Sequence, residues 1–333
     1  MNRRIEPSLP IVKRSFSIKS SSAPWLALHL HAVTPPENAQ RAVLLLHGAT
    51  LSGYIFDPPA PAPSWQERLA ARGWASYALD ARGFGRSTRP VPGDPGCDEN
   101  RPFAHAEDGV ADVADVMRFL REERGHAQVA LVGFSWGTIL AGCFLAAQPE
   151  TVSKLVLYAP IYAERNPAWI AKLCDPRNPA ALNPAFGAYR WTTAEALRAR
   201  WDADIPIAEK EAWRAGDVLG AVLKGALDCD PLSSTRTPPA FRAPSGPFAD
   251  LFRAFTGRPV YDPSAIRAPA LIVRGDADTT STDADSRGLL RDLGSDVKRY
   301  RTIASGSHFA FFERSAPLLF EACEAFLETS GFD

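Results

Sequence analysis

The amino-acid sequence predicts an α/β fold with a mostly parallel central sheet, flanked by helices and interrupted by one helical insertion. Two observations lead to this prediction. Short apolar runs alternate with segments of helical periodicity over most of the 333 residues, as in repeated β-α-β units. The alternation stops between residues 161 and 262, where prolines and tryptophans are frequent and strand-like runs disappear. A chain of this length can bury one large core that carries such an insertion.

Seven short runs have the composition of strands. Several are apolar throughout, which is typical of parallel strands that are covered on both faces. In chain order the expected strands are residues 25–33, 41–47, 74–80, 128–133, 152–160, 269–275 and 297–303.

Helical patterns separate these runs. Residues 64–73 begin at Ser64, which can cap a helix, and end at Gly73, which can stop one. Residues 107–125 carry apolar side chains at a spacing close to 3.6 residues. Further helices are expected in the insertion and near the C-terminal end, at about 193–201, 207–215, 217–227, 248–255 and 318–327.

Charge and cysteine usage exclude several classes of function. The formal net charge is −1, without a stripe of Lys and Arg, so we expect no nucleic-acid partner. No run approaches the roughly 18 apolar residues of a membrane span, and no apolar stretch of a signal peptide follows the basic N-terminus. Five widely spaced cysteines without a CxxC pair are typical of reduced thiols. We therefore expect a cytoplasmic protein.

The segment Gly133-Phe134-Ser135-Trp136-Gly137 lies between an apolar strand-like run and an apolar helical run. A serine at such a sharp strand-to-helix turn is typical of a nucleophile elbow. The flanking glycines fit this interpretation, because side chains there would collide with neighbouring backbone.

A serine nucleophile needs a base and an orienting acid. His308 follows the last expected strand and is the predicted base, because serine is a poor nucleophile until a neighbour takes its proton. Asp276 and Asp278 both lie just beyond a strand end, where either carboxylate could orient the imidazole. The resulting order Ser, Asp, His along the chain is that of α/β hydrolases.

A fourth segment, LLLHGATLSG, ends a strand at His47-Gly48. The next backbone N–H can point toward the elbow, and with the N–H of Trp136 it would form an oxyanion hole. His47 is expected to brace this loop rather than to act as a base.

With these segments together, the chain resembles the capped serine hydrolases of the α/β-hydrolase fold. The resemblance rests on LLLHGAT, ALDARGFGRST, LVGFSWGTILA, VYDPSAIRAPALIVRGDAD and SGSHFAFFE. It implies Ser135 as nucleophile, His308 as base and Asp278 as acid, with Asp276 in reserve. It also implies oxyanion donors at Ala49 and Trp136, with Thr50 as the alternative to Ala49. The implied core is 1–160 and 263–333, and the implied helical cap is 161–262.

These residues predict hydrolysis of a carboxylic ester, thioester or lactone of small to medium size, without a metal or organic cofactor. Four tryptophans fall in the expected cap, and one or two facing the pocket would favour a small-molecule substrate with an apolar or aromatic portion. They are Trp169, Trp191, Trp201 and Trp213.

Several alternatives remain open. The elbow GFSWGT also resembles that of proline iminopeptidases, in which acids of the cap could hold a free amine. Those enzymes carry Gly-Gly-Pro-Gly after the histidine, where this chain has HGATLSG. The same triad supports perhydrolase (haloperoxidase-like) or C–C bond hydrolase activity. Epoxide hydrolases are disfavoured because their nucleophile is an aspartate. A ligand-binding receptor on the same fold is the alternative that is not an enzyme.

Overall fold

An eight-stranded sheet forms the centre of the protein in the computed structural model, which describes residues 10–37, 39–91, 93–149 and 152–329. The strand order is β1-β2-β4-β3-β5-β6-β11-β12. The first three strands in this order pair antiparallel, and all later pairs are parallel. The predicted mostly parallel sheet is confirmed. Its strands are β1 (Val12–Lys19), β2 (Ala27–Thr34), β3 (Arg41–Leu46), β4 (Trp74–Asp80), β5 (Val129–Phe134), β6 (Leu155–Tyr158), β11 (Ala270–Gly275) and β12 (Lys298–Ile303).

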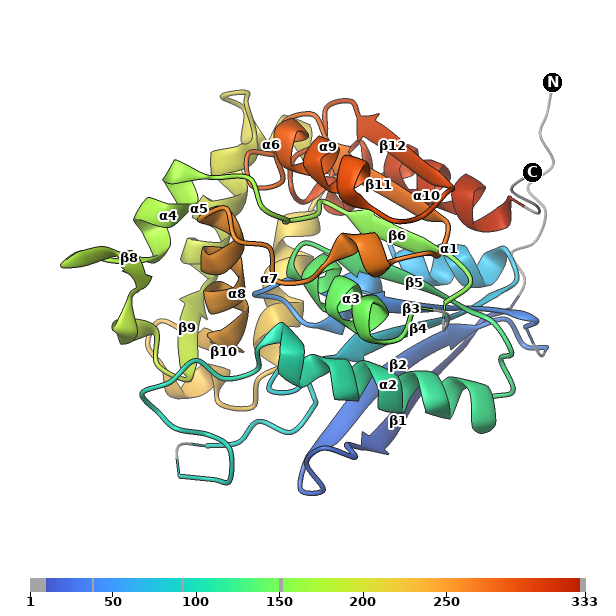
Figure 1. Cartoon of the computed structure of the whole chain (residues 1–333), viewed down its shortest axis with the longest axis horizontal. Helices are drawn as coiled ribbons and strands as arrows, with labels where there is room; N and C mark the ends of the chain where they lie inside the picture. Colours follow the sequence, from blue (N-terminus) through green and yellow to red (C-terminus); the bar gives the residue numbers. More distant parts are fainter. Residues whose placement is uncertain (1–9, 38, 92, 150–151, 330–333) are drawn as a thin grey trace.

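Helices cover both faces of this sheet (Figure 1). One face packs against α2 (Ala106–Glu122), α3 (Trp136–Ala147) and α9 (Asp283–Asp292). The other face packs against α1 (Trp65–Ala71) and α10 (Ala316–Glu328). Because alternate side chains of a strand point to opposite faces, each central strand serves two clusters of buried side chains.

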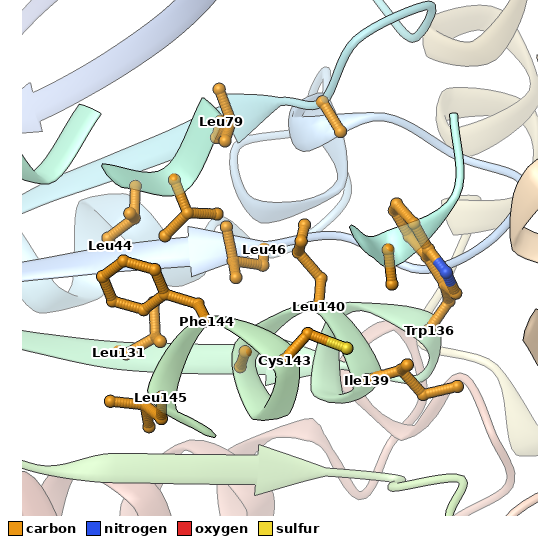
Figure 2. Close-up of a cluster of buried hydrophobic side chains, with 14 of the residues drawn as sticks. Leu44, Leu46, Leu79, Leu131, Trp136, Ile139, Leu140, Cys143, Phe144 and Leu145 are labelled. Carbon is orange, nitrogen blue, oxygen red and sulfur yellow. The ribbon is translucent and has the colours of Figure 1, made fainter. Parts of the chain in front are cut away.

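The strand β3 illustrates this division. Leu44 and Leu46 join the cluster beneath α3, whereas Val43 and Leu45 join the cluster beneath α1 and α10. Figure 2 shows the first cluster, in which leucines of the sheet lie against the side chains of α3. Burying each such side chain contributes about 1.5–3 kcal/mol, so the helix that begins at the elbow is held firmly on the sheet.

The insertion between β6 and β11 holds helices and also short strands, at the left of Figure 1. Its helices are α4 (Pro167–Leu173), α5 (Ala194–Asp204), α6 (Lys210–Trp213), α7 (Val218–Asp228) and α8 (Gly246–Phe255). Its strands are β7 (Cys174–Asp175), β8 (Asn178–Leu182), β9 (Tyr189–Thr193) and β10 (Ala240–Pro244). They form two antiparallel pairs, β7 with β8 and β9 with β10.

The expectation that strands are missing from this segment was therefore wrong. The four strands are short and carry proline, alanine and polar residues, so they form no apolar run. β9 pairs with a strand almost fifty residues further along the chain, which leaves no local signature. The boundaries of core and cap, 1–160, 161–262 and 263–333, stay predictions, and 1–9 and 330–333 lie outside the described residues.

The strand β1 was not predicted either. It lies at the edge of the sheet, where most of its side chains are exposed, and its sequence VKRSFSIK contains no apolar run. The other described elements are short 3₁₀ helices, at Gly53–Phe56, Pro184–Phe186, Ser233–Thr235, Pro263–Ala265 and Ala310–Phe312. Within the described residues, no helix combines the length and apolarity needed to traverse a bilayer.

Candidate active site

The turn between β5 and α3 places Ser135 in a strained conformation. Its φ is 55° and its ψ is −120°, a region that costs a residue with a side chain roughly 1–3 kcal/mol. A Cβ on Gly133 would lie 2.5 Å from the carbonyl oxygen of Gly137, and a Cβ on Gly137 would lie 2.3 Å from that of Leu46. Both glycines are therefore needed for this close approach of backbone segments, as the elbow interpretation requires.

The three predicted side chains meet at this turn. His308 Nε2 lies 2.9 Å from Ser135 Oγ, and His308 Nδ1 lies 2.8 Å from Asp278 Oδ2. Because a carboxylate can only accept, Nδ1 carries the proton and Nε2 is left free to accept one. Tyr158 donates its hydroxyl to the carbonyl of His308 at 2.9 Å, which fixes the loop that carries the imidazole. All three side chains are buried, with relative exposures of 5% or less.

Asp278, rather than Asp276, faces the imidazole. Asp278 Oδ1 accepts the backbone N–H groups of Thr280 at 2.8 Å and Ser281 at 2.9 Å. Burial opposes ionisation of this carboxyl, but the facing His308 and the two N–H groups hold its pKa below the ordinary value. Asp276 instead accepts the backbone N–H of Gly306 at 3.2 Å. The two acids that the sequence left open thus have different partners.

The expected oxyanion loop is braced by His47. Its Nδ1 donates to the carbonyl of Gly48 at 2.8 Å, and its Nε2 accepts the N–H of Ala81 at 3.1 Å. Burial lowers the pKa of His47, which favours this neutral form. Ala49 follows and lines a cavity that also reaches Ser135 and His308. Trp136 is the first residue of α3, and N–H groups in a first turn lack an intrahelical partner.

Asp250 of α8 links the insertion to the elbow, which the sequence did not indicate. Its Oδ2 accepts the indole N–H of Trp136 at 2.8 Å and the backbone N–H of Ala106 at 2.8 Å. Its Oδ1 accepts from Nδ1 of His105 at 3.1 Å. The indole of Trp136 is thus tied to α8, and one carboxylate joins α8, the start of α2 and the start of α3.

Glu313 makes a second link between the insertion and the site. One of its oxygens accepts the indole N–H of Trp201 at 2.8 Å, and the other accepts that of Trp213 at 2.8 Å. The same carboxylate accepts the backbone N–H of Ser307 at 2.8 Å and its hydroxyl, next to His308. Burial raises the pKa of Glu313, against the effect of these donors. A single buried side chain therefore connects α5 and α6 to the histidine loop.

A cavity of about 300 Å³ opens at Ser135 and His308. Apolar side chains form most of its wall, and these are Leu51, Phe134, Trp169, Leu173, Phe186, Ala196, Leu197, Phe248, Leu251 and Phe309. Among the described residues that line the cavity, Trp169 is the one tryptophan of the insertion. Trp201 and Trp213 bind Glu313, and Trp191 lies beneath the guanidinium of Arg236.

The charged side chains on this wall are all basic. Lys172, Arg190 and Arg200 line the cavity, and no Asp or Glu is found among the described residues that do so. Arg200 forms an ion pair with Asp204 at 2.7 Å. In the described part of the chain, no cluster of three or more His, Cys, Asp or Glu could hold a metal ion.

The sequence is related to that of known hydrolases. Epoxide hydrolase B of Mycobacterium tuberculosis is 29% identical over 129 residues, which are 39% of this chain and 31% of that protein. Epoxide hydrolase 3 of Siraitia grosvenorii is 30% identical over 129 residues, which are 38% of this chain and 34% of that protein. The chain thus spans about a third of the length of these relatives.

Solved structures agree in fold over nearly the whole chain. A bromoperoxidase from Bacillus anthracis matches with a TM-score of 0.65 and 17% identity, covering 95% of this chain and 100% of that one. At such an identity the likeness concerns the fold alone. The family model of the α/β-hydrolase fold matches residues 41–315, which include the sheet strands β3, β4, β5, β6, β11 and β12 and the three side chains at the elbow. The chain therefore belongs to the α/β-hydrolase fold family.

Proposed function

We propose that this protein is a serine hydrolase that cleaves a carboxylic ester, thioester or lactone of small to medium size through an acyl-enzyme. The observation that carries the proposal is the continuous chain of hydrogen bonds from Ser135 through His308 to Asp278, which opens onto an apolar cavity. In this proposal residues 161–262 form the cap over the site.

The proposed reaction begins when His308 Nε2 takes the proton of Ser135 Oγ while that oxygen attacks the substrate carbonyl carbon. Asp278 holds the imidazole in the required tautomer and stabilises its protonated form. The N–H groups of Ala49 and Trp136 stabilise the negative charge on the former carbonyl oxygen. The imidazolium then protonates the leaving alcohol or thiol. Water, deprotonated by the same histidine, repeats the sequence and releases the acid.

The relatives named as epoxide hydrolases raise an alternative, which the residue at the elbow disfavours. A carboxylate that opens an epoxide forms an ester, and water can hydrolyse that ester. A serine oxygen that opens an epoxide would form an ether, which has no carbonyl for water to attack. Ser135 therefore fits acyl transfer better than epoxide opening.

The iminopeptidase alternative needs an acidic group to hold the free amine of its substrate. Lys172, Arg190 and Arg200 give the wall of the cavity the opposite charge. Asp204, one of the acids of the insertion, is already paired with Arg200. Esters therefore rank ahead of aminopeptidase substrates, and perhydrolase or C–C bond hydrolase activity ranks third.

A fluorophosphonate probe and a p-nitrophenyl ester test the proposal. The folded protein should become covalently labelled and should hydrolyse the ester, and Ser135→Ala should lose both properties without losing its fold. A binding protein without turnover would show neither labelling nor hydrolysis in its native form. Turnover retained by Ser135→Ala would place the reaction elsewhere.

A further inference from the structure

Arg190 of β9 projects into the wall of the cavity, and each group that contacts its guanidinium is neutral. One terminal nitrogen donates to the carbonyl of Pro244. The other donates to the carbonyl of Ala49 and, at 3.2 Å, to the hydroxyl of Thr50. The ring of Phe248 lies beneath the guanidinium, with 3.5 Å between its centroid and Cζ.

This positive charge has no carboxylate partner in the described part of the chain. None of the ion pairs found there includes Arg190, although several other arginines form one. Burial lowers the pKa of Arg190 to about 9, which leaves the side chain protonated at neutral pH. Carbonyl dipoles and an aromatic face compensate a buried charge only in part, and buried charges are normally paired with an opposite charge.

Two other partly or fully buried arginines pair with a carboxylate, whereas buried Arg274, which is not among the described residues that line the cavity, donates to backbone carbonyls. Arg200, on the same cavity wall, pairs with Asp204 at 2.7 Å. Arg82 pairs with Asp112 at 2.7 Å. Within the cavity, the charge of Arg200 is therefore compensated by the protein and that of Arg190 is not.

We propose that Arg190 binds a carboxylate of the substrate, so that the enzyme acts on esters that carry a free carboxylate. The inference rests on the proposed ester hydrolysis and names its substrate class. Arg190 contacts Ala49 and Thr50 of the expected oxyanion loop, so the carboxylate lies on that side of the cavity. The apolar wall formed by Trp169 and its neighbours takes the rest of the substrate.

A guanidinium suits this task because its donors lie in one plane and match the two oxygens of a carboxylate. Lys172, exposed at the same cavity, adds positive potential that attracts an anion. The competing explanation is that Arg190 only ties the β9–β10 pair to the loop of Ala49. A structural tie would affect charged and neutral substrates alike, so substrate selectivity separates the two explanations.

The experiment compares esters that differ in one charge. In the first pair, mono-p-nitrophenyl adipate carries a carboxylate on the acyl group, and its methyl ester is the neutral partner. In the second pair, 4-carboxyphenyl hexanoate carries a carboxylate on the leaving alcohol, and phenyl hexanoate is the neutral partner. For at least one pair, the wild-type kcat/KM should favour the charged ester by about 10- to 100-fold, the range expected for a charge-assisted hydrogen bond.

Arg190→Met should lose that preference while it still hydrolyses the neutral ester, and Arg190→Lys should keep part of it. The matched control is Arg236→Met, which removes an exposed cap arginine that stacks on Trp191, and it should keep the wild-type preference. The wild-type comparison stands even if Arg190→Met fails to fold.

Two results would overturn the inference. One is equal wild-type turnover of charged and neutral esters in both pairs, and the other is an equal loss on charged and neutral esters in Arg190→Met. The proposed function would still hold in either case, because the neutral esters are turned over. Its own failure would appear differently, as absent turnover of all four esters and absent fluorophosphonate labelling of Ser135.

Discussion

Replacing Asp278 by asparagine tests whether the carboxylate sets the protonation of His308. In the native protein Oδ1 accepts two backbone N–H groups, from Thr280 and Ser281, and Oδ2 accepts the N–H of His308. An asparagine keeps the first two bonds only if its oxygen takes the place of Oδ1. Its NH₂ group then faces His308 and makes Nδ1 an acceptor, which moves the imidazole proton to Nε2.

That tautomer cannot take the proton of Ser135, because Nε2 already carries one. The opposite amide orientation restores the tautomer but points two N–H donors at the NH₂ group, which costs about 1–3 kcal/mol for each unsatisfied buried group. We therefore expect the tautomer to change and kcat to fall by about 10⁴, as for other triad aspartates. This corresponds to about 5 kcal/mol of transition-state stabilisation. Stopped assays with a p-nitrophenyl ester measure the loss, and circular dichroism checks the fold.

Asp276→Asn is the matched control, on the same loop and with the same chemical change. An asparagine oxygen can still accept the N–H of Gly306, which is the contact of Asp276 in the native protein. Its kcat should stay within about threefold of wild type, since the change removes no interaction with His308. The reasoning is refuted if Asp278→Asn keeps kcat within tenfold of wild type, or if Asp276→Asn shows the large loss instead.

Two further predictions concern the elbow and the contact between α2 and α8. Gly137→Ala would place a Cβ 2.3 Å from the carbonyl oxygen of Leu46 and 2.7 Å from that of His47. The start of α3 must move, so kcat/KM should drop by about 100-fold or more, as expected for a misplacement near 1 Å; near-native kinetics in a p-nitrophenyl ester assay would contradict this. The hydrogen bond to Asp250 raises the pKa of His105 above 6.5. The protonated imidazole therefore stabilises the folded state below pH 6.5, and this stabilisation is lost as the pH rises through the pKa of His105 in the folded protein. Urea unfolding should show that the stability advantage of wild type over His105→Gln shrinks as the pH rises above 6.5. An advantage independent of pH would count against this role.

Sequence patterns a few residues long predict the buried strands and the elbow of this protein. Apolar runs indicate the buried strands, because a parallel strand covered on both faces excludes polar side chains. The glycines on either side of Ser135 indicate the elbow, because the close approach of backbone at that turn excludes a Cβ. The serine, the acid and the histidine each follow the end of a strand, and the order of these strands along the chain gives the order of the three residues. These features depend on local sterics and burial, and a single sequence records them.

Contacts between distant segments were decided by the tertiary structure alone. The resemblance to α/β hydrolases already favoured Asp278 over Asp276, but only the fold places Asp278 against a histidine about thirty residues away. The pairing of β9 with β10 and the links made by Asp250 and Glu313 join segments that carry no shared pattern. The uncompensated charge of Arg190 is likewise invisible in the sequence, because whether an arginine has a partner depends on which carboxylates the fold brings within reach.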